Sequence, residues 1–159
     1  MKKHLFSNNQ PMSYFKFIGL ILWGLSFSIT VIAQTESEPN GQFSEANNIS
    51  LVNLTGEIQG RISDAGESDF YYVDLPSNGV FQLEVTDVPA NIPLTLRLYD
   101  SEQKRIRSES RGIGESIKIE QSVCEAGRYF FEIEETSVSG QTNTDLYTFT
   151  VSLLSLIHI

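Results

Sequence analysis

A two-residue alternation of apolar and polar side chains, broken at intervals by turns, is the feature that most constrains how this chain folds. Between positions 81 and 86 an apolar residue occupies every second position, and the pattern recurs at 94–99, 117–119, 129–134 and 147–152. Successive side chains of a β-strand point to opposite faces. Each run therefore predicts a strand with one face on a core and the other in water, which places Glu132 and Glu134 on the wet face.

Turn compositions separate these runs. Residues 76–79, 100–103, 125–127 and 139–141 contain the Gly, Pro, Asn, Asp or Ser residues that favour turns, and no segment between them has helical spacing. Short strands at such intervals predict an all-β fold, an antiparallel jelly-roll-like β-sandwich of about eight strands. The aromatic side chains expected to fill its core are Tyr71, Phe81, Tyr129, Phe131, Tyr147 and Phe149.

The first 33 residues read as an export signal rather than as part of this domain. Residues 18–33 carry no charge, Lys16 precedes them, and Val31 and Ala33 supply the small residues of a cleavage site before Gln34. We therefore expect a signal peptide at 1–33, with Met12 as an alternative start. The apolar run is shorter than the ~20 residues of a membrane span, so an uncleaved anchor is the second interpretation.

The last six residues, 154–159, read LSLIHI and resemble one reading frame of a widely used sequencing adapter. An ordinary apolar strand end is the alternative interpretation. With both ends set aside, the expected domain is 34–153. If the adapter interpretation holds, the gene continued, and further domains belong downstream in cis.

The expected domain is strongly acidic. It holds all 20 acidic residues but only 8 of the 11 basic ones, which gives a formal charge of −12. A surface of this sign repels nucleic acid and anionic lipid, so we expect neither nucleic-acid binding nor membrane binding after signal cleavage. One local reversal of sign is the cluster Lys104, Arg105, Arg107 and Arg111. It is either a site for an acidic partner or anionic polysaccharide, or a solvated hairpin.

The residues needed for common catalytic sites are missing from 34–153. The two histidines, His4 and His158, both lie outside it, which removes Ser-His-Asp and Cys-His catalysis and the usual zinc sites. The single cysteine, Cys124, excludes an internal disulfide, and we interpret it as a small buried hydrophobe. The fragment is therefore not expected to be an enzyme.

Two oxygen-rich clusters point to a hard cation. Glu36, Glu38 and Asn40 alternate along the chain, so an extended segment would direct all three the same way. A second cluster, Asp64, Glu67 and Asp69, precedes the apolar run 70–73. Ca²⁺ takes 6–8 oxygen ligands from carboxylates, amides and carbonyls, so the two clusters predict a calcium site if they meet. The alternative is a solvated linker followed by an acidic turn.

Seven motifs in register resemble the bacterial pre-peptidase C-terminal domain, a family related to the collagen-binding modules of clostridial collagenases. The resemblance covers about residues 36–153. The motifs are Glu36–Asn40 (ESEPN), Ala46-Asn47, Gly56–Ile58 (GEI), Asp69–Val73 (DFYYV), Leu94–Asp100 (LTLRLYD), Ala126–Ile133 (AGRYFFEI) and Leu146–Val151 (LYTFTV).

The resemblance implies a jelly-roll β-sandwich without catalytic activity, appended to secreted peptidases and other exported proteins. In the collagen-binding relatives, calcium is held by the E-x-E-P-N segment and by acidic residues before the following strand. Glu36, Glu38, Asn40 and Asp69 match those ligands, and Glu67 stands where a shorter Asp is usual. Asp64 lies in the same loop and matches no ligand. Collagen binding itself does not carry over, because fold does not fix a ligand.

Together these features predict an exported, non-catalytic accessory module, stabilised by Ca²⁺, which binds an extracellular protein or polysaccharide. The expected location is extracellular, periplasmic or on the cell surface. Two alternatives stay open: a part of a secreted peptidase whose catalytic domain is missing, and a structural cell-surface spacer.

Overall fold

The computed structural model describes residues 33–123, 125–137 and 144–154. Most of the predicted signal peptide, Cys124 and positions 155–159 lie outside the described residues. Within the described ranges there is no helix long and apolar enough to cross a membrane. The helical structure there is one short 3₁₀ turn, η1 (Phe43–Glu45), and the rest of the regular structure is β-strand.

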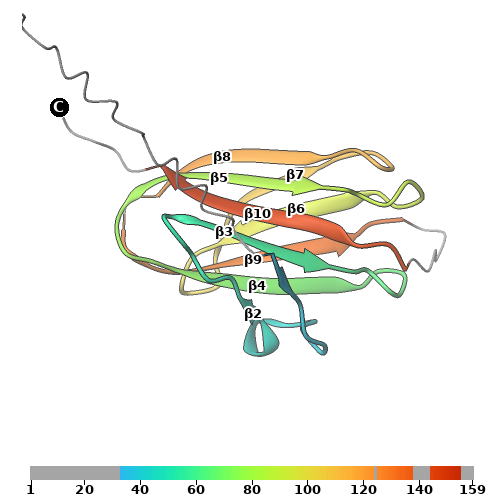
Figure 1. Ribbon diagram of the computed structural model, residues 1–159, viewed down its shortest axis with the longest axis horizontal. Helices are drawn as coiled ribbons and strands as arrows, with labels where there is room; N and C mark the ends of the chain where they lie inside the picture. The colour runs from blue at the N-terminus through green and yellow to red at the C-terminus, as the bar shows by residue number, and fades with distance from the viewer. Residues whose placement is uncertain (1–32, 124, 138–143, 155–159) are drawn as a thin grey trace, which may run out of the picture.

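Ten strands in the described residues form two five-stranded sheets (Figure 1). Sheet A has the order β1-β3-β10-β5-β8, and sheet B has the order β2-β4-β9-β6-β7. The strands of sheet A are β1 (Gln34–Thr35), β3 (Thr55–Gly60), β10 (Tyr147–Leu154), β5 (Gly79–Thr86) and β8 (Ile117–Val123). Those of sheet B are β2 (Asn47–Asn48), β4 (Ser68–Leu75), β9 (Gly127–Glu135), β6 (Leu94–Tyr99) and β7 (Arg105–Ser110).

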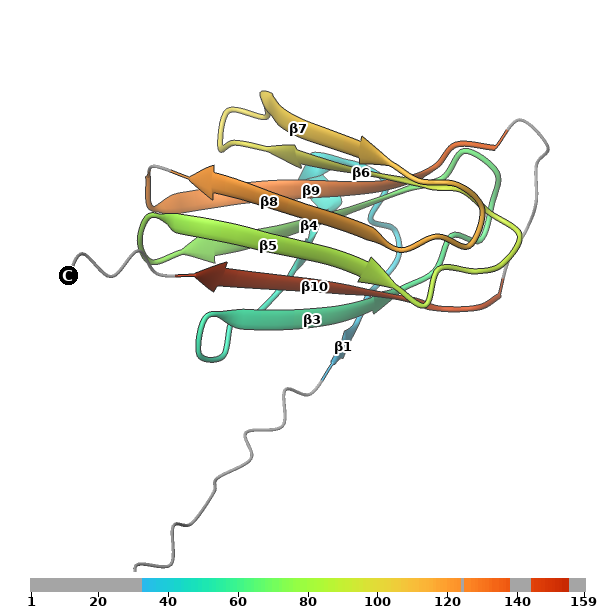
Figure 2. The same ribbon diagram turned by 90° about the horizontal axis from the view of Figure 1, so that it is seen from above.

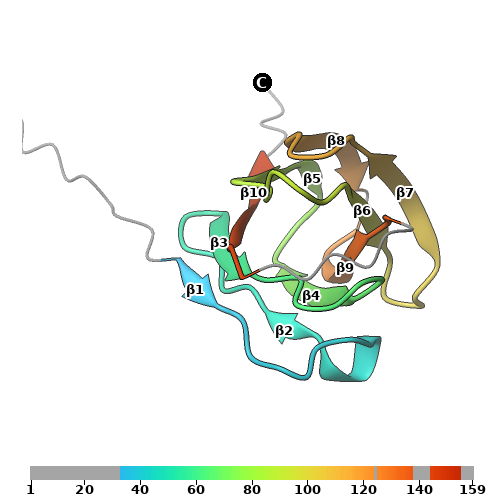
Figure 3. The same ribbon diagram turned by 90° about the vertical axis from the view of Figure 1, so that its right-hand side faces the viewer.

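The two sheets lie face to face as a β-sandwich, whose strands run across the view in Figure 2 and are seen end-on in Figure 3. The predicted all-β sandwich is therefore confirmed, and its eight longer strands pair antiparallel. The sheets are nevertheless mixed, because β1 pairs parallel with β3 and β2 pairs parallel with β4. Each of these added strands is only two residues long, too short to leave an alternating pattern in the sequence.

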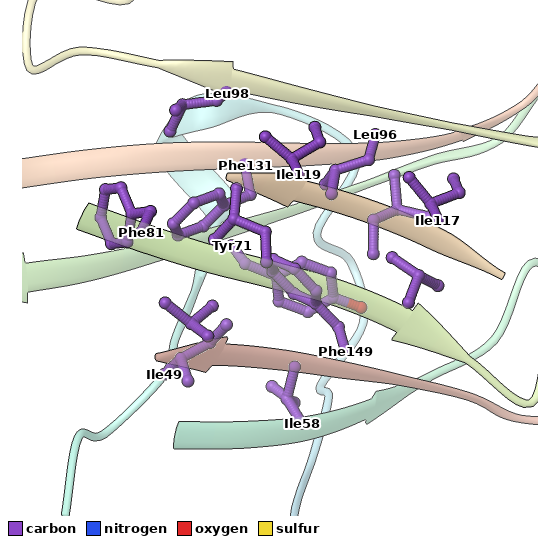
Figure 4. Close-up of a cluster of buried hydrophobic side chains, with 14 of the residues drawn as sticks. Ile49, Ile58, Tyr71, Phe81, Leu96, Leu98, Ile117, Ile119, Phe131 and Phe149 are labelled. Carbon is purple, nitrogen blue, oxygen red and sulfur yellow. The ribbon is translucent and has the colours of Figure 1, made fainter. Parts of the chain in front are cut away.

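The core lies where the inward faces of the two sheets meet (Figure 4). Phe81 and Phe149 of sheet A meet Phe131 of sheet B at ring-centroid distances of 5.7 and 5.2 Å, and all three are fully buried. Such edge-to-face pairs are favourable beyond the area they bury. The apolar half of the alternation thus forms one continuous core, as predicted.

The outer face of sheet B departs from the predicted wet face. Phe43 of η1 packs against Phe70, Tyr99 and Phe130 at centroid distances of 4.7, 5.1 and 5.4 Å. The centre of β9 is buried on both faces as a result, and Glu132 is only 8% exposed. Its interpretation as a solvent-facing residue is therefore wrong, because η1 and the neighbouring side chains of β6 cover that face.

The N-terminal segment 34–48 closes one side of the sandwich. It runs from the β3 edge of sheet A to the β4 edge of sheet B, and carries β1, η1 and β2 (Figure 3). Because β3 and β4 are consecutive in the chain, the turn that joins them lies beside this segment. The segment thereby brings its acidic residues to the start of β4.

Candidate functional site

Four of the predicted ligand residues meet where the N-terminal segment crosses the start of β4. Glu36, Glu38 and Asn40 come from the segment, and Asp69 is the second residue of β4. One carboxylate oxygen each of Glu36, Glu38 and Asp69 lies within 4.8 Å of the others. We refer to these four residues as the acidic cluster.

Backbone hydrogen bonds fix the approach of the segment. The Glu36 N–H donates to the carbonyl of Gln59 in β3 at 3.0 Å, and the Phe70 N–H donates to the carbonyl of Asn40 at 2.9 Å. The Glu38-Pro39 peptide bond between these anchors is cis. The segment is thus attached to sheet A at Glu36 and to sheet B at Asn40, the first and last cluster residues that it contributes.

Hydrogen bonds also connect the cluster internally. The Asn40 N–H donates to Glu38 Oε2 at 3.0 Å, and Asn40 Nδ2 donates to Glu36 Oε2 at 3.2 Å. Both Asn40 and Asp69 have no exposed surface, whereas Glu38 is exposed. Asn40 Oδ1 and Asp69 Oδ1 are buried without a hydrogen-bond partner among the described residues. A buried polar atom without a partner is costly, so these two oxygens mark a position suited to a cation.

Two core tyrosines, Tyr71 and Tyr147, complete the site. The sequence predicts that they are buried in the core but does not predict that they contact the acidic cluster. Tyr71 of β4 donates its hydroxyl to Glu36 Oε2 at 2.5 Å, and Tyr147 of β10 donates to Asp69 Oδ2. The two hydroxyls also lie 2.5 Å apart. The hydroxyl of a buried Tyr usually finds a hydrogen-bond partner. Two tyrosines at predicted core positions therefore indicate buried polar partners, and this is the one signal in the sequence that could have connected Tyr71 and Tyr147 to the acidic residues.

The electrostatics of the cluster disfavour three simultaneous charges. Burial, and then the neighbouring charge of Glu36, raises the pKa of Asp69 to about 8. Burial also raises the pKa of the Glu36 carboxyl, against the lowering effect of its hydrogen bonds. Carboxylates held this close favour the binding of either a proton or a cation. A bound cation would lower the pKa values of Asp69 and Glu36 again and so favour their ionised forms.

Glu67 and Asp64, the other two predicted ligands, lie outside the acidic cluster. The Glu67 carboxylate accepts the backbone N–H of Ser63 and, at 3.0 Å, that of Asp64. It therefore stabilises its own turn. Asp64 is exposed, and its carbonyl accepts the Glu67 N–H at 3.2 Å.

Comparison with known proteins supports the fold alone. No protein-family model matches the chain, and no curated protein sequence matches it. Among solved structures, it is similar to the periplasmic inhibitor of g-type lysozyme, PliG, from Aeromonas hydrophila, with 10% identity and a TM-score of 0.53. That similarity covers 69% of this chain and 96% of the inhibitor.

Two further similar solved structures have lower TM-scores. The pre-peptidase C-terminal domain of a collagenase from Bacillus anthracis has 18% identity and a TM-score of 0.48, over 69% of this chain and 95% of that domain. The mitogen of Yersinia pseudotuberculosis has 12% identity and a TM-score of 0.46, over 67% of this chain and 92% of the mitogen.

Proposed function

We propose that residues 34–153 form an exported, non-catalytic module that binds an extracellular protein or polysaccharide and is stabilised by one Ca²⁺. The metal ligands in this proposal are Glu36, Glu38, Asn40 and Asp69. The observation that carries it is the meeting of three carboxylates within 4.8 Å, together with the buried Oδ1 atoms of Asp69 and Asn40, which lack a hydrogen-bond partner among the described residues.

The donor set favours calcium over other metals. All four side chains offer oxygen, and Ca²⁺ takes 6–8 oxygen ligands in a flexible geometry, whereas Zn²⁺ prefers nitrogen and sulfur. Four side chains leave room for backbone carbonyls and water. The bound ion would connect the N-terminal segment to β4, and its contribution would be stability rather than chemistry.

Burial of the cluster supports a role for an ion instead of a substrate. Asp69 and Asn40 are fully buried, so a molecule larger than an ion has no access to their oxygens. A carboxyl with a strongly raised pKa can mark a catalytic base, but such a base must reach its substrate. The absence of histidine from 34–153 also supports a non-catalytic role.

Thermal unfolding of the full chain, followed by circular dichroism near pH 8, tests the calcium site. The midpoint temperature of unfolding should be higher in calcium than in chelator, because an ion that binds only the folded state stabilises that state. Glu38→Ala should remove this increment. Asp69→Asn should also remove it, and should raise the midpoint in chelator because it eliminates a buried carboxyl that is costly to ionise.

Glu57→Gln provides the matched control, because it removes one charge from the half-exposed outer position of β3. This variant should keep the full calcium increment. Identical melting curves for the unaltered chain in calcium and in chelator would contradict the site.

The binding role has its own test. The chain should be retained by collagen fibres, insoluble glycans or cell-wall material, and retention should not require any turnover. Failure to bind every one of these materials would contradict the module's proposed role while leaving the calcium site in place.

A further inference from the structure

The most exposed strand of the sandwich is also its most basic. β7 ends the order of sheet B, so one of its edges pairs with β6 and the other has no strand partner in its sheet. Five of its six residues are exposed, and the sixth, Glu109, is half-buried. With the flanking Lys104 and Arg111, the segment 104–111 carries four cations and one carboxylate in a domain of opposite sign.

Three of these cations have no ion-pair partner among the described residues. The salt bridges within the described ranges use Arg97, Arg111 and Arg128, and none involves Lys104, Arg105 or Arg107. The nearby Asp100 carboxylate accepts backbone N–H groups, including that of Lys104, and so stabilises its turn. In a domain with 20 acidic residues, three unpaired cations on one edge form a surface available to an external anion.

The edge is poorly suited to adding another strand. A bulge interrupts its register with β6 between Leu98 and Tyr99. Arg107 and Glu109 lie opposite the buried Leu98 and Leu96, so these charged residues occupy the core-facing side of β7. Bulges and inward-pointing charges are the features by which edge strands avoid pairing with other chains. We therefore expect β7 to contact a partner through its side chains and not through backbone hydrogen bonds.

We propose that β7 and its flanks bind an anionic polysaccharide. Six extended residues span about 20 Å, and the bulge places Arg105 opposite the outward-facing Tyr99 while Arg107 lies opposite Leu98, so the cations are spread along both faces of this edge. A polymer with repeated charges can contact several of them at once, which a single small anion cannot. Arginine binds carboxylate, sulfate and phosphate groups through paired N–H donors. Ile106 and Ile113 are the exposed large apolar side chains of this region, and no aromatic anchor of the kind that protein interfaces use lies on β7.

This inference rests on the proposed role as a binding module but not on its calcium site, which lies beside β3 and β4 at the opposite edges of the sheets. A polysaccharide bound along β7 would not contact the acidic cluster. The two proposals therefore fail independently.

Affinity electrophoresis of the full chain in calcium buffer, with hyaluronate, heparin, poly-glutamate or neutral dextran in the gel, tests the inference. Hyaluronate and heparin should retard the chain, dextran should not, and added salt should weaken the retardation because exposed charges are screened. Arg107→Glu should weaken binding by about tenfold or more. Lys118→Glu, an equal change of charge at an exposed position of β8, should weaken it far less.

Several outcomes would overturn the proposal. Equal losses for the two variants would mean that overall charge controls binding. Stronger retardation by poly-glutamate than by either polysaccharide would assign the edge to an acidic protein instead. Absence of retardation by both anionic polymers would remove the site, while an intact calcium increment in thermal unfolding would leave the proposed stabilisation standing.

Discussion

Tyr147 donates its hydroxyl to the carboxylate of Asp69, and this hydrogen bond crosses from one sheet of the sandwich to the other. Tyr147 lies on β10 in the middle of sheet A, and Asp69 lies on β4 of sheet B. Both residues are fully buried. The acidic cluster is therefore connected directly to the packed interior, so changes in the charge of the cluster affect the stability of the whole fold.

Replacing Tyr147 with Phe should lower the free energy of unfolding by about 1–3 kcal/mol, because Asp69 loses its donor inside the core. Urea denaturation measures the loss. Calcium should still stabilise this variant, because all four proposed ligands remain. Tyr72→Phe is the matched control, since Tyr72 lies half-exposed on the outer face of sheet B, and it should change stability little. A Tyr147→Phe variant as stable as the control would show that the hydrogen bond is energetically unimportant.

Stability without calcium should fall as pH rises from about 5 to about 8. The pKa of Asp69 is raised from 3.8 to about 8 in the folded state, so the folded chain holds a proton that the unfolded chain has released. Folding then becomes less favourable with increasing pH across this window, by on the order of a few kcal/mol. Calcium should flatten the trend because the cation favours the ionised carboxylate.

Urea denaturation in chelator at a series of pH values measures this dependence, and Asp69→Asn should remove most of it. The lowered pKa values of Asp74 and Glu135 act in the opposite direction, but only below their ordinary values of 3.8 and 4.5. The window above pH 5 is therefore free of them. Stability that stays constant or rises there in chelator would contradict the assignment.

Gly60 should not tolerate a side chain. It pairs with Tyr147 across β3 and β10, and a Cβ at this position would overlap the hydroxyls of Tyr71 and Tyr147. Gly60→Ala should therefore cost about 1–3 kcal/mol of unfolding free energy and reduce the calcium increment. At Gly41 the nearest atom to an added Cβ is the Ser68 carbonyl oxygen at 3.7 Å, so Gly41→Ala is the control. Equal melting temperatures for the two variants would refute this steric account.

The sequence predicts the core strands well because burial of one face imposes a strict period. The run 147–152 illustrates this: Tyr147, Phe149 and Val151 are all fully buried in β10. It predicts the meeting of Asp69 with the N-terminal acidic residues only through a resemblance, because residues about thirty positions apart carry no spacing rule. Without the resemblance, the sequence does not predict that Asp69 contacts the N-terminal segment.

Other features depend on which groups become neighbours only in the folded structure. Glu67 has the chemistry of a ligand, but its Oε2 accepts the backbone N–H groups of Ser63 and Asp64 in its own turn. Phe130 and Glu132 occupy outward positions that alternation assigns to water, yet Phe43 covers the first and Arg97 pairs with the second. Alternation identifies the two faces of a strand and does not reveal what covers the outer one.

The cross-strand ion pairs that Arg97 and Arg128 form on the outer face of sheet B should differ in energy because their burial differs; Arg97 pairs with Glu134 as well as Glu132. Arg97 pairs with Glu132 at 3.0 Å with side chains 20% and 11% exposed, whereas Arg128 pairs with Asp74 at 2.8 Å with side chains 44% and 57% exposed. Arg97→Met leaves a buried carboxylate without its cation, which should cost about 1–3 kcal/mol. Arg128→Met should cost less than about 1 kcal/mol, because water solvates the remaining carboxylate.

Urea denaturation of the two variants at low and high salt distinguishes these contributions. The effect of Arg128→Met should shrink further at high salt, because exposed charges are screened, while the effect of Arg97→Met should persist. A larger loss for Arg128→Met would indicate that its position 3.9 Å above the Tyr72 ring contributes more than the ion pair. Arg128→Lys would then separate the two contributions, because lysine keeps the charge but lacks the planar group that stacks on the ring.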